Sequence, residues 1–186
     1  MNIFIGIIIG LIFLAVLWLI YTYNRLITLR MRAREAISDI DVQLKRRFDL
    51  IPNLIETVKG YMGHEREVLE HVTEARAKVA STGGDPIERA GQENMLSNTL
   101  KTLFAVSENY PDLKANANFL ELQRELSDTE NKIQASRRFY NTTVRDLNTK
   151  IETFPTNMIA GWFHFVSEKF FEVENEAEKS VPKVKF

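Results

Sequence analysis

The sequence predicts an all-α protein: an N-terminal transmembrane helix followed by an up-and-down four-helix bundle with long antiparallel helices. Residues 1–24 contain no charged side chain, whereas residues 25–186 carry all 24 Lys and Arg and all 25 Asp and Glu residues. After residue 25, apolar residues recur at spacings of three and four, the helical period, and no stretch alternates as a half-buried strand would. Short connections between these helical patterns predict antiparallel neighbours.

Length and composition exclude several classes of protein. The 186 residues suffice for one domain with its own core. The chain has no cysteine, which excludes disulfide scaffolds, cysteine-ligated zinc, thiol nucleophiles and the acylated cysteine of a lipoprotein. A net charge of −1 argues against a nucleic-acid partner, because binding DNA or RNA requires a concentrated basic surface.

The first element is a transmembrane anchor over residues 1–24. Its apolar run, residues 3–23, would span roughly 31 Å as a helix, close to the hydrocarbon thickness of a bilayer. Trp18, Tyr21 and Tyr23 gather at its C-terminal end, where aromatic rings prefer the headgroup layer. A cleaved signal peptide fits less well, because a basic leader and a small-residue cleavage site are missing. The sequence therefore predicts an uncleaved helix in a lipid bilayer.

The flanks of this helix predict its orientation. Arg25, Arg30, Arg32 and Arg34 follow the apolar run directly, and the N-terminal flank offers only the α-amino group. Because positive residues stay on the cytoplasmic side, we expect the N-terminus outside and residues 25–186 in the cytoplasm.

Two glycines in the apolar run suggest contact between copies of the chain. Gly6 and Gly10 form a GxxxG pattern, which lets two helix backbones approach closely in lipid. The apolar run Met158–Val166 is a second candidate contact between copies if it is not wholly core, and confinement in a shared membrane lets two weak contacts together predict a homo-oligomer.

The body, residues 25–180, is divided by prolines, and residues 181–186 form a short extension. Helices are expected over residues 25–50, 52–81, 86–109, 118–153 and 155–178. Pro52 either reverses the chain or kinks one long helix, and a change in the apolar phase favours the reversal. Gly84 and the cap Asp85 separate the second and third helices, and Asn118 is the expected N-cap of the longest one.

The sequence contains no complete motif for a catalytic site or a metal site. His64-Glu65 begins an HExxH motif, but Val68 stands where the second histidine is required. We therefore expect no catalysis, cofactor or metal site. The alternative is a metal-dependent sensor or enzyme built from His64, Glu67, His71 and Glu130.

Polar residues on apolar helix faces predict a structural network. Glu130, Arg137 and Asn141 share the face of Ile133 and Tyr140, and buried charges persist only when they are paired. The candidate partners near the end of the first helix are Asp41, Lys45, Arg46 and Arg47. The alternative is that the helix leaves these groups in solvent.

The run Met158–Val166 is apolar on nearly all sides but too short to span a bilayer. We expect this run to belong to the protein core. The second interpretation is a patch that binds a partner, and the third is a segment that contacts the membrane surface. Trp162, Phe163 and Phe165 are its candidate interaction residues. If the run acts as an interfacial wedge, the protein is a bilayer-shaping protein.

Several short segments, taken in order along the chain, carry a resemblance to a known family. They are Ile40–Arg47, Asp49–Leu54, Val58–Tyr61, His64-Glu65, Tyr110–Asn116, Phe119, Leu122-Gln123, Thr129-Glu130, Arg137-Arg138, Tyr140-Asn141, Asn148 and Phe154-Pro155. In these residues the chain resembles the LemA family over almost its whole length. It departs from the family pattern at Ile37 and Phe48, where tryptophan and histidine are common.

The resemblance implies a bacterial inner-membrane protein with one N-terminal helix and a four-helix bundle, and it supplies no catalytic or ligand-binding residues. The family is associated with membrane remodelling in magnetosome formation and is often encoded near membrane proteases. By this analogy we expect a scaffold or adaptor that acts through self-association and membrane-protein partners, with membrane proteases among the candidate partners.

Overall fold

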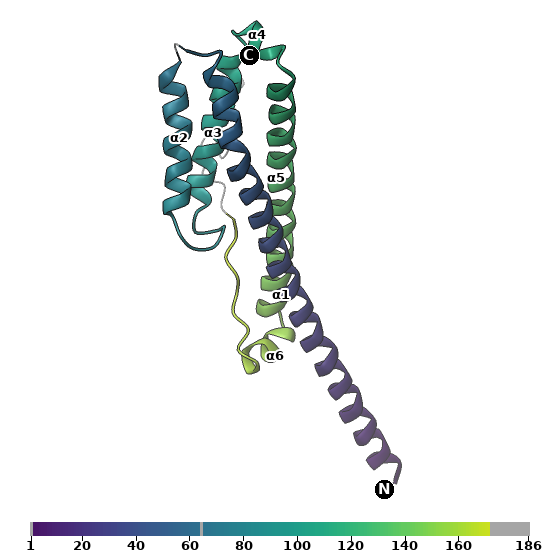
Figure 1. The fold of residues 1–186 in the computed structure, drawn as a ribbon. Helices are drawn as coiled ribbons and strands as arrows, with labels where there is room; N and C mark the ends of the chain where they lie inside the picture. The colour runs from purple at the N-terminus through teal and green to yellow at the C-terminus, as the bar shows by residue number, and fades with distance from the viewer. Residues whose placement is uncertain (1, 64, 172–186) are drawn as a thin grey trace, which may run out of the picture. The chain divides into compact units, whose positions relative to one another are not determined.

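The computed structural model describes residues 2–63 and 65–171, and every regular element in these residues is an α-helix (Figure 1). The all-α prediction is thereby confirmed. The helices are α1 (Asn2–Lys59), α2 (Arg66–Ser81), α3 (Ala90–Ser107), α4 (Pro111–Lys114), α5 (Ala117–Glu152) and α6 (Thr156–Trp162).

The chain forms two compact units that share α1 and α5. Of the described residues, the anchor unit comprises 2–36 and 138–170, and the bundle unit comprises 37–63, 65–137 and Phe171. Each unit has its own apolar cluster.

Helix α1 runs without a break through Pro52, so the predicted chain reversal at this proline is wrong. Proline removes one backbone donor, which leaves the carbonyl four residues earlier, at Phe48, without its helical partner. Arg76 of α2 replaces that donor, because its Nε lies 3.3 Å from the Phe48 oxygen while its guanidinium lies 3.8 Å from the Phe48 ring centroid. Ile51 and Leu54 on either side are fully buried, so the apolar face also holds the helix in place.

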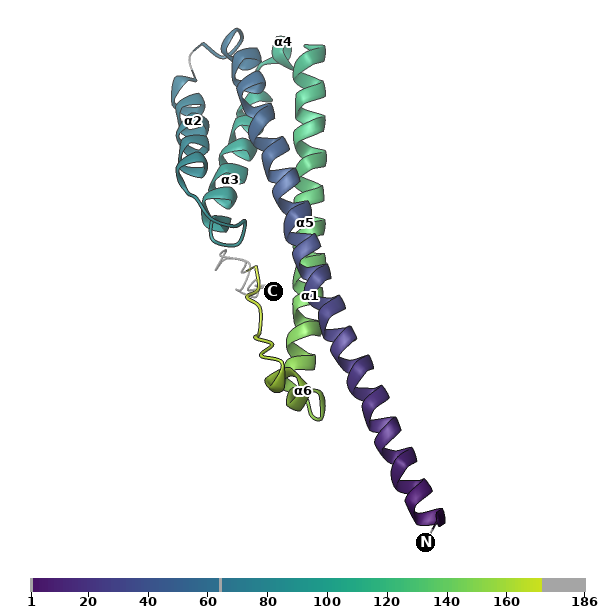
Figure 2. The ribbon, with the colours of Figure 1, turned by 60° about the horizontal axis from the view of Figure 1, so that its bottom comes forward.

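The reversal instead follows Lys59, and it divides the predicted helix 52–81. The backbone amides of Tyr61 and Met62 both donate to the Val58 carbonyl, at 2.9 and 3.0 Å. Met62 is buried in the turn, and Tyr110 donates a hydrogen bond of 3.0 Å to Glu65 just before α2 begins. Figure 2 shows α2 returning beside α1 and then α3 beside α2.

Side-chain caps lie shortly before α3 and at the start of α5. The Asp85 carboxylate accepts hydrogen bonds from the amides of Ile87 and Glu88, at 2.8 and 3.1 Å, as predicted for a cap, but turns occupy residues 86–89 and α3 starts at Ala90. Gly84 precedes this cap with a φ of 96°. The cap of α5 is Asn116, whose Oδ1 accepts from the Phe119 amide at 3.0 Å, two residues earlier than the predicted Asn118. The bounds of α5 otherwise agree with the prediction to within one residue.

The bundle unit places α1, α2, α3 and α5 around one apolar core. Side chains from all four helices are buried there at helical spacing. They include Ile51, Leu54, Val58, Leu69, Val72, Val79, Leu96, Leu100, Leu103, Phe119 and Leu126.

The predicted helix 155–178 is wrong over most of its described length, because α6 ends at Trp162. The amides of His164 and Phe165 donate to Gly161 and Ala160, at 3.2 and 2.9 Å, which is the Schellman ending of a helix. His164 occupies the left-handed position of that ending, with a φ of 55°. Residues 172–178 lie outside the described part of the chain.

After α6 the anchor unit continues as an extended segment along α5. Asn148 receives the Glu168 amide on its Oδ1 and donates its Nδ2 to the Glu168 carbonyl, both at 2.9 Å. The Tyr140 hydroxyl donates to the Lys169 carbonyl at 2.8 Å. These side chains satisfy backbone groups that a helix would otherwise pair, so tertiary contacts compensate for the helical hydrogen bonds that are lost.

The apolar cluster of the anchor unit joins α1, α5 and the α6 region. It contains Leu26, Leu29, Leu147, Ile159, Ala160 and Phe165. Before this cluster, α1 is the one described helix that is long and apolar enough to cross a membrane, and none of its most apolar window is buried. The chain is therefore a helical protein with one candidate membrane-spanning helix.

Candidate functional site

The most prominent polar feature of the bundle unit is a buried arginine. Arg47 of α1 is only 1% exposed and lies between two carboxylates. Its guanidinium pairs with Glu93 of α3 and, at 2.7 Å, with Glu130 of α5. It also donates to the Ser97 hydroxyl and, at 3.2 Å, to the Glu93 carbonyl. Two negative charges therefore compensate one cation that water barely reaches.

This centre extends outward as a chain of ion pairs. Arg89 lies 3.5 Å from the second carboxylate oxygen of Glu93 and also pairs with Asp41 of α1. The order Asp41, Arg89, Glu93, Arg47, Glu130 alternates in sign. It connects α1, α3 and α5 through side chains alone, so it fixes the register of these helices.

The surroundings of Glu130 keep its carboxylate ionised. Burial is the largest single influence and raises its pKa, but the other influences outweigh it. These are a hydrogen bond from Gln134, the charge of Arg47, a hydrogen bond from Ser97 and the charge of Arg137. The net effect lowers the pKa of Glu130, which makes the carboxylate a weak base.

Arg137 is also half-buried, and burial followed by the nearby charge of Arg47 lowers its pKa. Its Nη1 donates to the Asn94 Oδ1 of α3 at 2.7 Å. Its guanidinium lies 5.3 Å from the ring centroid of Phe171.

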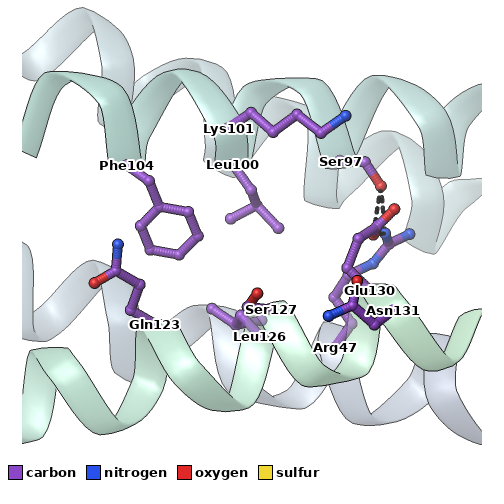
Figure 3. A pocket seen from close by; sticks show the side chains of 10 residues that line it. All are labelled: Arg47, Ser97, Leu100, Lys101, Phe104, Gln123, Leu126, Ser127, Glu130 and Asn131. Atoms are coloured by element: carbon purple, nitrogen blue, oxygen red, sulfur yellow. Dashed lines mark hydrogen bonds and ion pairs between the residues drawn. The ribbon is translucent and has the colours of Figure 1, made fainter.

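A cavity of about 220 Å³ lies beside this centre, between α3 and α5 (Figure 3). Its apolar lining comes from Leu100, Phe104 and Leu126, and Arg47 and Glu130 close one end. The remaining lining residues are polar or charged: Ser97, Lys101, Gln123, Ser127 and Asn131. An apolar floor with a polar rim is typical of a surface that receives a partner side chain or a small ligand.

The geometry offers no activated nucleophile at this cavity. Ser97 donates to the Glu130 carboxylate at 3.0 Å, but that carboxylate is already held by Arg47 and Gln134. A general base needs a pKa near the working pH, and the pKa of Glu130 is shifted in the opposite direction.

The structure brings only some of the predicted network residues together. Arg47 and Glu130 are paired, whereas Arg46 pairs with Glu125 on a more exposed face. Asp41 joins through Arg89. Arg137 contacts Asn94 rather than an acidic residue of α1, and Asn141 lies in the part of α5 that belongs to the anchor unit.

Sequence reasoning missed Glu93, Arg89 and Ser97. A signal for Glu93 was present, because it lies on the apolar face of α3 at helical spacing from Ala90, Leu96 and Leu100. An acidic residue on such a face requires a buried cation, which is the same argument that selected Glu130.

The structure divides the predicted interaction residues into open and buried ones. A Cβ added at Gly6 or Gly10 would have no atom of residues 2–63 or 65–171 within 4 Å, so none of these residues covers that face of α1. In the α6 region Trp162 is 73% exposed and Phe163 is partly exposed, whereas Phe165 belongs to the core of the anchor unit. The run Met158–Val166 is thus part core and part surface.

The metal hypothesis involves four residues. Glu67 and His71 are exposed on α2, Glu130 lies in the Arg47 centre, and His64 lies outside the described residues. Within residues 2–63 and 65–171, no three His, Cys, Asp or Glu side chains gather closely enough to hold a metal ion.

Comparisons with known proteins give consistent matches. The model of the LemA family matches residues 36–186. Protein LemA of Metamycoplasma hominis is 33% identical over 140 residues, which cover 74% of this chain and 63% of that protein.

Two more distant relatives are magnetosome proteins. MamQ 2 of Paramagnetospirillum magneticum is 23% identical, with 83% of this chain and 66% of that protein covered. MamQ of Magnetospirillum gryphiswaldense is 22% identical, with 82% and 65% covered. The chain spans just under two thirds of the length of these relatives.

Proposed function

The chain belongs to the LemA family, and from this we propose that it is a membrane-anchored scaffold or adaptor of the bacterial inner membrane. It acts through self-association and through membrane-protein partners, without catalysis. One observation carries the proposal: α1 is unbroken from Asn2 to Lys59, so the candidate membrane helix is also a core helix of the bundle. A partner bound to the bundle is thereby joined to the candidate membrane helix through one continuous helix.

The orientation that we propose follows from the arginines after the apolar run. The segment that follows the apolar run stays in the cytoplasm, and the bundle with it, because it carries four arginines: Arg25, Arg30, Arg32 and Arg34. A membrane protease or another inner-membrane protein would then meet the bundle unit on the cytoplasmic side. The relatives named magnetosome proteins support a membrane-associated helical protein.

Within this proposal, partners bind at the cavity between α3 and α5. Its apolar floor, formed by Leu100, Phe104 and Leu126, suits the apolar anchor side chain of a partner, and the polar rim suits hydrogen bonds. The ionised state of Glu130 supports binding rather than acid–base chemistry.

Copies of the chain associate through the face of α1 that carries Gly6 and Gly10. This face is open, and small residues let helix backbones approach closely in lipid. Confinement in one membrane raises the effective concentration of this weak contact.

Photo-crosslinking in native membranes tests the adaptor role. A crosslinker placed at Lys101, on the rim of the cavity, should capture a specific membrane protein that is identified by mass spectrometry. The matched control is Arg124, an exposed residue of α5 outside the cavity lining. Equal products at both positions, or none at Lys101, would argue against partner binding at this cavity.

Self-association and orientation have separate tests. Native mass measurement in nanodiscs should show an oligomer that Gly6→Leu with Gly10→Leu dissociates, and a wild-type monomer at all concentrations would refute self-association. Because the chain lacks cysteine, Asn2→Cys and Ser180→Cys each give a single thiol. An impermeant maleimide should label only the first in intact cells, and the reverse pattern would invert the topology.

A further inference from the structure

We infer that the α6 region, residues 153–167, is a second membrane-contact site that inserts into the headgroup layer of the bilayer that α1 spans. The inference requires only that α1 is inserted, and it depends on neither the adaptor role nor self-association. Every residue involved belongs to the anchor unit.

The α6 region packs onto α1 at the level where the apolar run ends. The ring of Phe163 lies 4.7 Å from that of Tyr23, and the ring of Phe165 lies 6.0 Å from it. The same cluster includes Leu19 and Leu29 of α1. Figures 1 and 2 both show α6 beside this part of α1.

The rise of about 1.5 Å per residue along an α-helix gives the depth of these contacts relative to the end of the apolar run. Leu19 lies about 6 Å along α1 before Tyr23, the last residue of the apolar run, and Leu29 lies about 9 Å beyond it. The interfacial layer on each side of the hydrocarbon is roughly 5–8 Å thick. The α6 region, which packs between these two positions on α1, therefore overlaps the headgroup layer.

The surface that the α6 region presents at this depth is rich in large exposed apolar side chains. Residues 153–167 contain no Asp, Glu, Lys or Arg, and the flanking charges are Glu152 and Glu168. The large apolar side chains that point away from the core are Phe154 (78% exposed), Met158 (66%), Trp162 (73%) and Val166 (74%). In water such a group would form an apolar patch of the kind that marks an interaction surface.

Continuity with α1 identifies the occupant as lipid. Trp18 and Tyr21 on the lipid-exposed side of α1 are themselves exposed, and the Tyr23–Phe163 ring contact carries this apolar surface onto α6. Tryptophan prefers the membrane interface, where its ring is in an apolar layer and its N–H meets polar groups. Arg30, whose guanidinium lies 5.0 Å from the Phe165 ring centroid, supplies a cation close to the phosphates.

The region is held in place on both sides, so it presents a defined surface. The Schellman ending fixes the chain after Trp162, and Asn148 and Tyr140 of α5 fix the segment that follows. Insertion at this site would therefore fix the rotation of α1 in the bilayer as well as its depth.

Depth-dependent quenching of tryptophan fluorescence tests the site. The chain has only two tryptophans, so the full-length protein with Trp18→Phe reports on Trp162 alone. It is reconstituted in phosphatidylcholine vesicles whose lipids carry bromine either near the top of the acyl chain or near its end. We expect blue-shifted emission that the shallow bromine quenches strongly and the deep bromine quenches less.

Two matched variants complete the experiment. The first carries Trp18→Phe, Trp162→Phe and Phe154→Trp, which moves the reporter within the same surface and should reproduce the shallow quenching. The second carries Phe139→Trp in the same background, because Phe139 is an exposed residue of α5 in the anchor unit, about 20 Å along the helix before Glu152. This control should be unquenched and red-shifted.

Three results would overturn the inference. Red-shifted, unquenched emission from Trp162 would place the surface in water. Blue-shifted emission that bromine does not quench, and that moves to the red on dilution with excess lipid, would assign the surface to a second copy of the chain. Persistence of unquenched blue-shifted emission after dilution would assign it to the protein itself.

Discussion

The bundle unit and the anchor unit use the same two helices, α1 and α5, but they treat large apolar side chains in opposite ways. In the bundle unit these side chains fill one core, and the exposed ones, such as Val42, Met95 and Leu120, are scattered singly. In the anchor unit they form a small core and leave Phe154, Met158, Trp162 and Val166 all exposed within one short stretch of sequence. The apolar face of a helix can therefore be buried in one segment and exposed in the next. An exposed apolar face of this kind is suited to contact with lipid rather than water.

The two units also differ in how they use charged side chains. The bundle unit buries Arg47 and compensates it with Glu93 and Glu130, whereas the anchor unit keeps the 15 residues 153–167 free of charge. The first arrangement specifies how helices align, and the second suits contact with lipid. Substitutions in each unit can test this contrast, and those at buried residues should have the largest effects.

Removing the buried cation should destabilise the bundle most. Arg47→Ala leaves Glu93 buried without its main partner, so we expect a loss of about 3–5 kcal/mol in the free energy of unfolding. Urea unfolding of the full chain in detergent, followed by circular dichroism, measures it. Arg124→Ala, at an exposed pair on α5, is the control and should change stability by less than about 1 kcal/mol. Similar effects of the two variants would show that the Arg47 centre is not a structural element.

Ile133 tests the core of the bundle unit. It is fully buried, so Ile133→Ala should lower the unfolding free energy by about 2–5 kcal/mol through lost burial and the cavity left behind. The same urea titration applies. An effect under about 1 kcal/mol would mean that the helices repack around this position.

A double-mutant cycle distinguishes the two neighbouring arginines. Arg47→Ala with Glu130→Ala should be non-additive, with a coupling of about 0.5–3 kcal/mol, because the two side chains are in contact. Arg46→Ala with Glu130→Ala should be additive, because Arg46 pairs with Glu125 instead. The opposite pattern would reassign the partner of Glu130.

Acid should weaken the bundle unit partly through Glu130. Its pKa is lower in the folded protein than in the unfolded chain, so its contribution to stability is complete above the unfolded pKa of about 4.3. That contribution is lost as the pH falls through the folded value. Glu130→Gln should therefore show a shallower decline of stability below this pH than wild type, and Gln134→Ala an intermediate one. If stability declined with pH in the same way in all three proteins, the lowered pKa of Glu130 would be contradicted.

The smallest folding effect belongs to the exposed surface of the anchor unit. Trp162→Ala should change the unfolding free energy by less than about 0.5 kcal/mol, because the side chain is mostly outside the core. Ile159→Ala, three residues earlier but buried, should cost about 2–5 kcal/mol in the same assay. If both variants lost equal stability, Trp162 would be a core residue and the contrast between the units would fail.

The sequence by itself determined the features that depend on local pattern. The uncharged run of residues 3–23, the helical spacing along α5 and the Asp85 cap follow from composition, period and side-chain chemistry within a few residues. The pairing of Glu130 with a basic residue of α1 also followed, since a charge on an apolar face needs compensation.

Tertiary structure decided the features in which a distant group replaces a local interaction. Pro52 remains helical because Arg76, 24 positions later, satisfies the Phe48 carbonyl. The segment after α6 is extended because Asn148 and Tyr140 satisfy its backbone. Arg47 rather than Arg46 occupies the centre because helix rotation, set by packing against α3 and α5, determines which of two adjacent side chains points inward. These outcomes depend on contacts between residues far apart in the chain, which local periodicity does not encode.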